Sequence, residues 1–223
     1  MNNELIINSA PKSAISEAIR TLRTNLQFSS IDKKIKTILV TSSVPGEGKS
    51  FIAANLACAF ANSGSKVLLV DCDIRKGRQH RIFKDHNRKG LSNLLLEDVR
   101  GVYYNYINET VIKNLSIIYK GMTPPNPSEL LNSEKNKQLI SILANSFDIV
   151  IFDGAPIVGL PDSLIMGRLV DGVIIVSSCK ETSVSVLEDT KRNLENVKAN
   201  ILGVVLNRAS TKKNRYYYGS YYG

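Results

Sequence analysis

The sequence predicts an α/β fold with a mostly parallel central sheet and helices on both faces of it. Three observations support this prediction. Short apolar runs rich in β-branched residues alternate with helical patterns. A turn rich in Gly and Pro joins the first run to a helix, and acidic residues end two later runs. The 223 residues suit one domain of this class. We expect it over residues 1–207, followed by a flexible tail over residues 208–223, which lacks apolar periodicity.

The first three predicted elements are a helix, a strand and a second helix. Residues 13–28 fit an amphipathic helix because their apolar positions recur at i, i+4, i+7 and i+11. This apolar stripe consists of Ile15, Ile19, Leu22 and Leu26. Residues 37–41 (TILVT) are apolar and β-branched, as in a buried strand. Residues 51–64 then read as a helix that Gly64 ends.

The rest of the domain continues the alternation of strands and helices. Further strand-like runs cover residues 67–71, 115–119, 147–153, 172–177 and 202–207. Helical patterns over residues 128–145 and 185–197 separate the later runs. Near-continuous apolar strands of this kind indicate a parallel sheet that is buried on both faces.

The net charge and the cysteines indicate which partners and which cellular compartment suit this protein. The formal net charge is +9, and part of the excess lies in residues 75–89. Such a run attracts acidic partners or is a solvated face, and we expect no nucleic acid. Three scattered cysteines without a CxxC pair favour a reducing, cytoplasmic compartment. No apolar run approaches the ~18 residues of a membrane span, so we expect none here.

Residues 43–50 (SVPGEGKS) carry the strongest chemical signal. They lie between a predicted strand and a predicted helix, the context that a phosphate-binding loop requires. The loop predicts a P-loop NTPase-like protein, although Ser43 stands where the usual pattern has its first glycine. Lys49 would reach the β- and γ-phosphates, and the Ser50 hydroxyl would bind Mg²⁺. The expected nucleotide contacts in this segment are Pro45, Gly46, Glu47, Gly48, Lys49, Ser50 and Phe51.

Carboxylates stand at the ends of two predicted strands. Asp71 and Asp73 follow one apolar run, and Asp153 ends another. The carboxyl ends of parallel strands share one edge of the sheet, where ligands bind. Asp71 and Asp73 would face the same side if the chain stayed extended. These carboxylates would supply the metal neutralisation and the proton acceptor that phosphoryl transfer needs; the alternative is a loop that merely faces water.

Several segments together resemble the cytoplasmic kinase of the bacterial tyrosine kinase family that controls capsule and exopolysaccharide synthesis. The resemblance covers nearly the whole chain and lies in SEAIRTLRTNLQFS, TSSVPGEGKS, VLLVDCDIRKG, PPNPSELL, LVDGVIIV and a tyrosine-rich tail. The chain departs from the family where GAP rather than TPP follows Asp153, and where Phe51 replaces a usual Thr. DIRKG also replaces the commoner DLRRP or DMRKP. These departures spare the lysine and the named carboxylates.

The resemblance implies a protein-tyrosine kinase that uses ATP and Mg²⁺. Lys49 and Ser50 would hold phosphates and metal. Asp73 and Asp153 would organise Mg²⁺, partly through waters, and Asp71 would accept the proton of a tyrosine hydroxyl. By analogy, Asn207 and Arg208 at the end of the last strand are candidates for contacts with the adenine.

The resemblance also implies an assembly. Glu17, Arg20 and Arg23, in the helix of residues 13–28, would build a ring-shaped oligomer, and the tail of one subunit would enter the site of the next. An activating transmembrane adaptor would be a separate chain that recruits this one to the inner face of the cell membrane. A tyrosine phosphatase would reverse the modification.

The tail is distinctive even without the resemblance. Its last eight residues contain five tyrosines, which cannot all be core residues on a segment without periodicity: Tyr216, Tyr217, Tyr218, Tyr221 and Tyr222. Each phosphate would add about −1.5 to −2 charge beside Lys212, Lys213 and Arg215, and several would reverse the sign of the tail. The alternative is an aromatic tail that binds a partner without modification. A second cluster, Tyr103, Tyr104 and Tyr106, lies inside the domain and is expected to be structural.

Two other functions fit the same fold. A partitioning or division-site ATPase would carry a signature lysine at the position of Val44, which counts against it. A nucleotide-gated regulator without kinase activity would recruit the polymer-export machinery instead.

Overall fold

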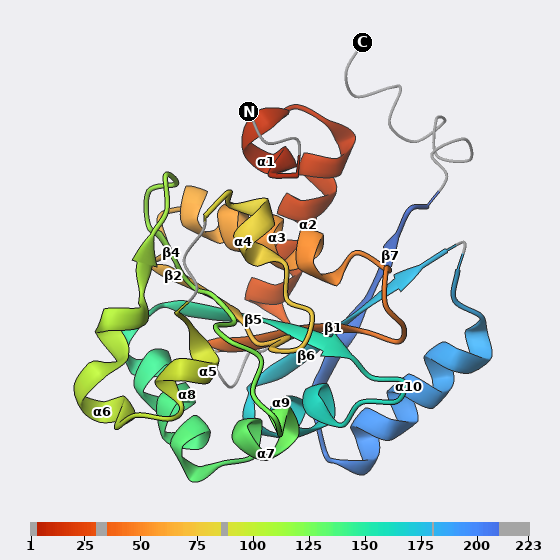
Figure 1. Cartoon of the computed structure of the whole chain (residues 1–223). Helices are drawn as coiled ribbons and strands as arrows, with labels where there is room; N and C mark the ends of the chain where they lie inside the picture. Colours follow the sequence, from red (N-terminus) through yellow and green to blue (C-terminus); the bar gives the residue numbers. More distant parts are fainter. Residues whose placement is uncertain (1–3, 30–34, 86–88, 180, 210–223) are drawn as a thin grey trace, which may run out of the picture.

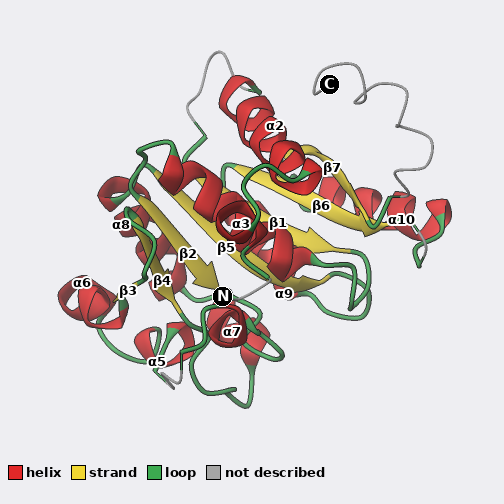
Figure 2. Ribbon diagram, turned by 90° about the horizontal axis from the view of Figure 1, so that it is seen from above, coloured by secondary structure: helices red, strands yellow, loops and turns green. Residues whose placement is uncertain are grey.

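A seven-stranded sheet runs through the middle of the molecule, in the order β3-β4-β2-β5-β1-β6-β7 (Figures 1 and 2). The computed structural model describes residues 4–29, 35–85, 89–179 and 181–209. The strands are β1 (Thr37–Ser42), β2 (Val67–Asp71), β3 (Asn108–Glu109), β4 (Leu115–Ile118), β5 (Ile149–Pro156), β6 (Gly172–Ser178) and β7 (Ile201–Asn207). All neighbouring strands pair in parallel except β3 and β4. The predicted mostly parallel sheet is therefore confirmed.

Helices cover both faces of this sheet, as predicted. The described helices are α1 (Ile6–Ser9), α2 (Ala14–Phe28), α3 (Lys49–Asn62), α4 (Gln79–Ile82), α5 (Leu91–Leu94), α6 (Val99–Val102), the 3₁₀-helix η1 (Tyr103–Tyr106), α7 (Pro127–Leu131), α8 (Glu134–Ser146), α9 (Asp162–Leu169) and α10 (Val184–Asn196). Figure 2 shows α2 and α3 above the strands, with α8 and α9 on the far side. Within the part of the chain that the structure describes, no helix is long and apolar enough to cross a bilayer.

Alternate residues of each strand enter two separate cores. In β1, Ile38 and Val40 pack with α3 on one face, whereas Leu39 joins the core that includes α8 and α9. Since a strand projects successive side chains to opposite faces, both must be apolar when both faces are covered. This requirement explains why the strands appear in the sequence as unbroken apolar runs.

The structure corrects one predicted helix. Residues 128–145 do not form one helix but two, α7 and α8. Ser133 lies between them and caps α8, because its hydroxyl oxygen accepts a hydrogen bond from the backbone N–H of Asn136. A serine in this extended conformation starts a new helix rather than continuing the previous one. The structure also contains elements that had not been predicted, namely α9, the antiparallel β3 and the short helices α1, α4, α5, α6 and η1.

The amphipathic helix over residues 13–28 is confirmed as α2, with Ser13 as its N-cap. Ile19 and Leu26 are buried, and Leu22 packs against the same core as α3. Ile15, at the other end of the predicted stripe, is half exposed. The apolar face of α2 is therefore buried along its middle and C-terminal part.

Candidate functional site

The site begins with the loop between β1 and α3, which adopts a phosphate-loop conformation. Gly46 and Gly48 have φ angles of +91° and +98°, a left-handed backbone that side chains with a Cβ rarely adopt. A Cβ at Gly48 would also lie 2.2 Å from the amide nitrogen of Asn207. The turn thus favours glycine at both positions, and the close approach of Asn207 adds a second reason at Gly48.

Glu47 maintains the shape of this loop from inside. Its buried carboxylate accepts hydrogen bonds from the backbone N–H of Val44 at 2.8 Å and of Ser178 at 2.9 Å, and from the Thr182 hydroxyl. Charge-assisted bonds of this kind are stronger than neutral ones. Since the carboxylate is used in this way, any contact of Glu47 with a nucleotide would come from its backbone. Sequence analysis had placed Glu47 among the nucleotide contacts without recognising this scaffolding role.

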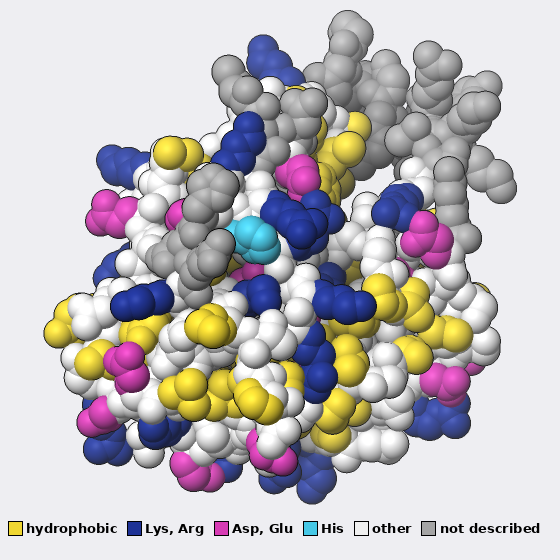
Figure 3. All heavy atoms as spheres, in the orientation of Figure 1, with side chains coloured by type: hydrophobic (Ala, Val, Ile, Leu, Met, Phe, Trp, Pro, Cys, Tyr) yellow, Lys and Arg dark blue, Asp and Glu magenta, His cyan; other side chains and the backbone are white. Residues whose placement is uncertain are grey.

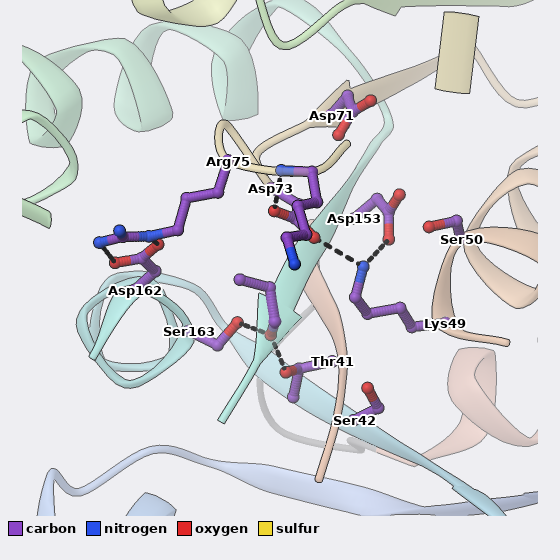
Figure 4. A network of polar contacts seen from close by, with 12 residues as sticks. Thr41, Ser42, Lys49, Ser50, Asp71, Asp73, Arg75, Asp153, Asp162 and Ser163 are labelled. Atoms are coloured by element: carbon purple, nitrogen blue, oxygen red, sulfur yellow. Dashed lines mark hydrogen bonds and ion pairs between the residues drawn. The ribbon is translucent and has the colours of Figure 1, made fainter. Parts of the chain in front are cut away.

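Lys49 lies between two carboxylates from different strand ends (Figure 4). Its ammonium group is 3.0 Å from Asp73 Oδ2 and 3.9 Å from Asp153 Oδ1. Burial alone would lower the pKa of Lys49, but the charges of Asp153 and Asp73 outweigh burial and raise it. Lys49 is therefore a cation at the carboxyl edge of the sheet.

Asp71 and Asp153 are neighbours in register at the ends of β2 and β5, and both are completely buried. Burial, together with the charge of Asp153, raises the pKa of Asp71 well above its usual value. Burial also raises the pKa of Asp153, although Lys49 and a hydrogen bond from Gln79 oppose this effect. Both carboxyl groups therefore take up a proton more readily than an exposed aspartate does.

The expectation that Asp71 and Asp73 face the same side is wrong in detail, because the chain does not stay extended beyond Asp71. The backbone N–H groups of Cys72 and Asp73 both donate to the Asp153 carbonyl oxygen at 3.0 Å. Asp73 consequently points at Lys49, whereas Asp71 lies apart from that pair in Figure 4 and accepts a hydrogen bond from Gln79. The two aspartates have different partners and hence different chemical environments.

The loop that follows β2 covers the Asp71 carboxylate. A Cβ added to Gly77 would lie 2.2 Å from Asp71 Oδ1, so the Gly77 backbone packs directly against this carboxylate. Asp73 closes the loop, since its Oδ1 accepts from the Lys76 backbone N–H at 2.9 Å. The candidate proton acceptor is therefore enclosed by the segment of residues 74–79 in this arrangement.

The groups gathered here suit a hydrated magnesium ion. Ser50, Asp73 and Asp153 offer hydroxyl and carboxylate oxygens, which Mg²⁺ prefers. Among the described residues, no three His, Cys, Asp or Glu side chains are close enough to form a direct metal cluster. Mg²⁺ usually retains several bound waters, so contacts through water would suit these carboxylates.

Asn207 and Arg208 reach the loop from the end of β7. The Asn207 amide donates to the Glu47 carbonyl oxygen at 2.8 Å, and the Arg208 guanidinium donates to the Gly46 carbonyl oxygen at 2.9 Å. Arg208 also pairs with Glu181. The two predicted adenine contacts therefore lie against the phosphate loop rather than at a distance from it.

The structure adds residues that sequence analysis missed. Gln79, the first residue of α4, contacts both Asp153 and the start of α3. Arg75 forms an ion pair with buried Asp162 at 2.6 Å, and its hydrogen bond to Asp162 raises the pKa of Arg75. This pair ties the loop after β2 to the start of α9. Arg75 lies within the DIRKG segment, but nothing in the sequence marks Asp162 or Gln79.

The described basic residues from Arg75 to Lys84 precede, form or follow α4, on a face where Lys and Arg side chains gather in Figure 3. Arg78 is paired with Glu4 at 2.8 Å, whereas Lys76 and Arg81 are exposed. A solvated face and a surface for acidic partners both remain compatible with this arrangement.

The residues predicted to form an oligomer lie on α2, away from the phosphate loop. The Arg20 guanidinium donates to Glu17 at 2.5 Å and to the Pro11 carbonyl oxygen at 2.8 Å, both within its own subunit. Arg23 donates to the Ala59 carbonyl oxygen of α3 at 3.4 Å. The predicted phosphoacceptors lie outside the described residues: Tyr216, Tyr217, Tyr218, Tyr221 and Tyr222.

Comparisons with known proteins match the chain over nearly its whole length. A family model described as an AAA domain matches residues 35–206. Tyrosine-protein kinase YwqD of Bacillus subtilis is 39% identical over 223 residues, which cover 100% of this chain and 92% of that protein. Tyrosine-protein kinase wzc of Salmonella typhimurium is 32% identical over 99% of this chain, but the match spans only 30% of that longer protein. The crystal structure of the chimerical protein CapA2B2 has a TM-score of 0.88 at 39% identity, and the match covers 93% of this chain and 90% of that one.

Proposed function

Because this chain belongs to the family of bacterial tyrosine-protein kinases, we propose that it transfers the γ-phosphoryl group of ATP to tyrosines of its own C-terminal tail. One observation carries the proposal most directly. Lys49 from the phosphate loop and the carboxylates of Asp73 and Asp153 converge at a single point of the sheet edge. Phosphoryl transfer depends mainly on positioning and charge stabilisation, which this arrangement supplies.

Each group has a place in the reaction. The loop N–H groups and Lys49 bind and orient the phosphates, while Ser50, Asp73 and Asp153 hold Mg²⁺. The metal neutralises charge on the phosphate oxygens when it is bound. Asp71 accepts the proton of the tyrosine hydroxyl as the tyrosine oxygen bonds to the γ-phosphorus and the bond to the ADP oxygen breaks. Burial and the charge of Asp153 raise the pKa of Asp71, which makes it a stronger base than an exposed aspartate.

The acceptor comes from another subunit in this proposal. Glu17, Arg20 and Arg23 on α2 contribute to a ring-shaped homo-oligomer, and each tail reaches a neighbouring site. The match to only 30% of a longer tyrosine kinase supports the idea that further segments act together with this domain. We propose that a separate transmembrane adaptor supplies them, activates the kinase and recruits it from the cytoplasm to the inner face of the membrane. Capsule or exopolysaccharide synthesis would be the regulated process, and a tyrosine phosphatase would reverse the modification.

Incubation of the full chain with Mg-ATP, followed by detection of phosphotyrosine, tests the kinase proposal. We expect the label to vanish with Lys49→Met and with all five tail tyrosines changed to Phe. Tyr104→Phe is the matched control, because this tyrosine is 62% exposed but lies inside the domain, and it should leave the label intact. ATP hydrolysis without any phosphotyrosine would instead favour a partitioning-type ATPase. Label that persists in the Lys49 and tail variants would exclude transfer at this site.

A further inference from the structure

Gln79 connects three parts of the site through one buried residue. Its side-chain amide donates to Asp153 Oδ2 at 2.9 Å and to the Ser50 carbonyl oxygen at 3.0 Å. Its backbone N–H donates to Asp71 Oδ2 at 3.0 Å. Gln79 has no exposed surface, so water cannot replace these contacts. The residue thus links a predicted metal carboxylate, the start of α3 and the predicted proton acceptor.

The same place contains an unusual concentration of buried acceptors without donors. Among the described residues, Gln79 Oε1 and Asp71 Oδ1 have no hydrogen-bond donor, and Asp153 Oδ1 has only the Lys49 ammonium group at 3.9 Å. Turning the Gln79 amide over would not satisfy them, because its oxygen would then face Asp153 Oδ2 and the Ser50 carbonyl, which are both acceptors. Buried polar atoms are normally hydrogen-bonded, so an external donor would stabilise this cluster.

A hydrated divalent cation is a donor of the required kind. Its bound waters present O–H groups, and Mg²⁺ usually keeps several of them. We propose that Gln79 is a positioning residue of the magnesium site, whose Oε1 accepts a hydrogen bond from a metal-bound water while its amide N–H groups orient Asp153. This inference rests on the proposed use of Mg-nucleotide by the site.

The position of Gln79 also couples the metal to Asp71. Because its backbone holds Asp71 and its side chain holds Asp153, a change at the metal reaches the proposed proton acceptor through one residue. Residues that orient a metal's immediate ligands commonly change metal affinity by about 10- to 100-fold when they are replaced. We therefore expect the main effect of Gln79 to appear in the dependence on magnesium.

Binding of a fluorescent ADP analogue, measured against Mg²⁺ concentration and also in excess EDTA, tests the proposal. Gln79→Leu removes the amide and should raise the Mg²⁺ concentration for half-maximal binding about tenfold, with the affinity in EDTA unchanged. Gln79→Glu keeps an acceptor oxygen but loses the donors, and it should stay closer to the wild type than Gln79→Leu. Gln138→Leu, an exposed change on α8, is the matched control and should alter neither value.

The outcomes separate the acceptor role from a purely structural one. An equal loss of Mg²⁺ affinity in Gln79→Leu and Gln79→Glu would overturn the proposal, because only the lost donors would then matter. An unchanged Mg²⁺ dependence, or an equal loss in EDTA, would overturn it as well. If Gln79→Leu does not fold, Gln79→Met keeps the length without the amide and replaces it. Since ADP carries no γ-phosphoryl group, the result is independent of whether the chain phosphorylates tyrosine.

Discussion

Replacing Lys49 by Met removes the cation that lies between Asp73 and Asp153 and leaves these buried carboxylates uncompensated. Removing one partner of a buried ion pair typically costs about 3–5 kcal/mol. This loss of stability has an upper limit, because a carboxyl group can take up a proton instead of remaining a buried, unpaired charge. From an ordinary Asp pKa of about 3.9, protonating one group costs about 4 kcal/mol at pH 7 and about 1.5 kcal/mol at pH 5. We therefore expect Lys49→Met to lower the free energy of unfolding by about 3 kcal/mol at pH 7 and by about half as much at pH 5.

The sign of this pH dependence follows from Asp153. Burial already raises its pKa in the folded protein, and loss of Lys49 removes the charge that opposes this rise. The folded variant then binds more protons than the unfolded chain. Relative to the wild type, the Lys49→Met variant therefore keeps its stability below the Asp pKa of the unfolded chain, about 3.9. It loses stability as the pH rises toward the raised pKa of Asp153 in the folded variant.

Urea unfolding without nucleotide or metal, followed by circular dichroism because the chain has no Trp, measures both values. The control is Lys137→Met, which breaks an exposed pair with Glu134 on α8 and should cost less than about 1 kcal/mol at either pH. A loss that is the same at pH 5 and pH 7, or that does not exceed the loss in the control, would refute the reasoning about the buried charge cluster.

Two further predictions concern the phosphate loop and α2. Glu47→Gln places an NH₂ group opposite the backbone N–H donors that the carboxylate now accepts from. We therefore expect the free energy of unfolding to fall by about 1.5–3 kcal/mol and fluorescent ADP to bind more weakly. Wild-type values for both quantities would contradict the scaffolding role of Glu47. Arg20→Ala combined with Arg23→Ala should give a smaller species in light scattering and weaker tail phosphorylation, whereas exposed Arg192→Ala on α10 should not. An unchanged oligomer size in the double variant would remove the ring proposal for α2.

Most of the fold could be predicted from the sequence because its central strands are buried on both faces of the sheet. The central strands β1, β2, β5 and β6 are buried along their whole length, so each appears as a continuous apolar run. The failures occur where local chemistry overrides periodicity. Ser133 divides one helical pattern into two helices, and β3 is two residues long, too short to produce a pattern.

The candidate site was only partly predictable, and the difference has a physical cause. Lys49 and the three aspartates follow from rules about strand ends and phosphate loops, which depend on the order of elements in the chain. Gln79 and Asp162 owe their roles to the way the segment of residues 74–79 folds back over β2 and faces α9. Such a fold-back depends on contacts such as Gly77 against Asp71, and no spacing rule encodes those contacts.

The three aspartates at the sheet edge have different environments. Burial is the main cause of the raised pKa values of Asp71 and Asp153, and the charges of neighbouring carboxylates add to it. Among the described residues, Asp73 and Asp153 each pair with Lys49 within 4.0 Å, whereas Asp71 has no ion pair with it. The burial of Asp71 and its raised pKa therefore support our proposal that it, rather than Asp73 or Asp153, accepts the proton.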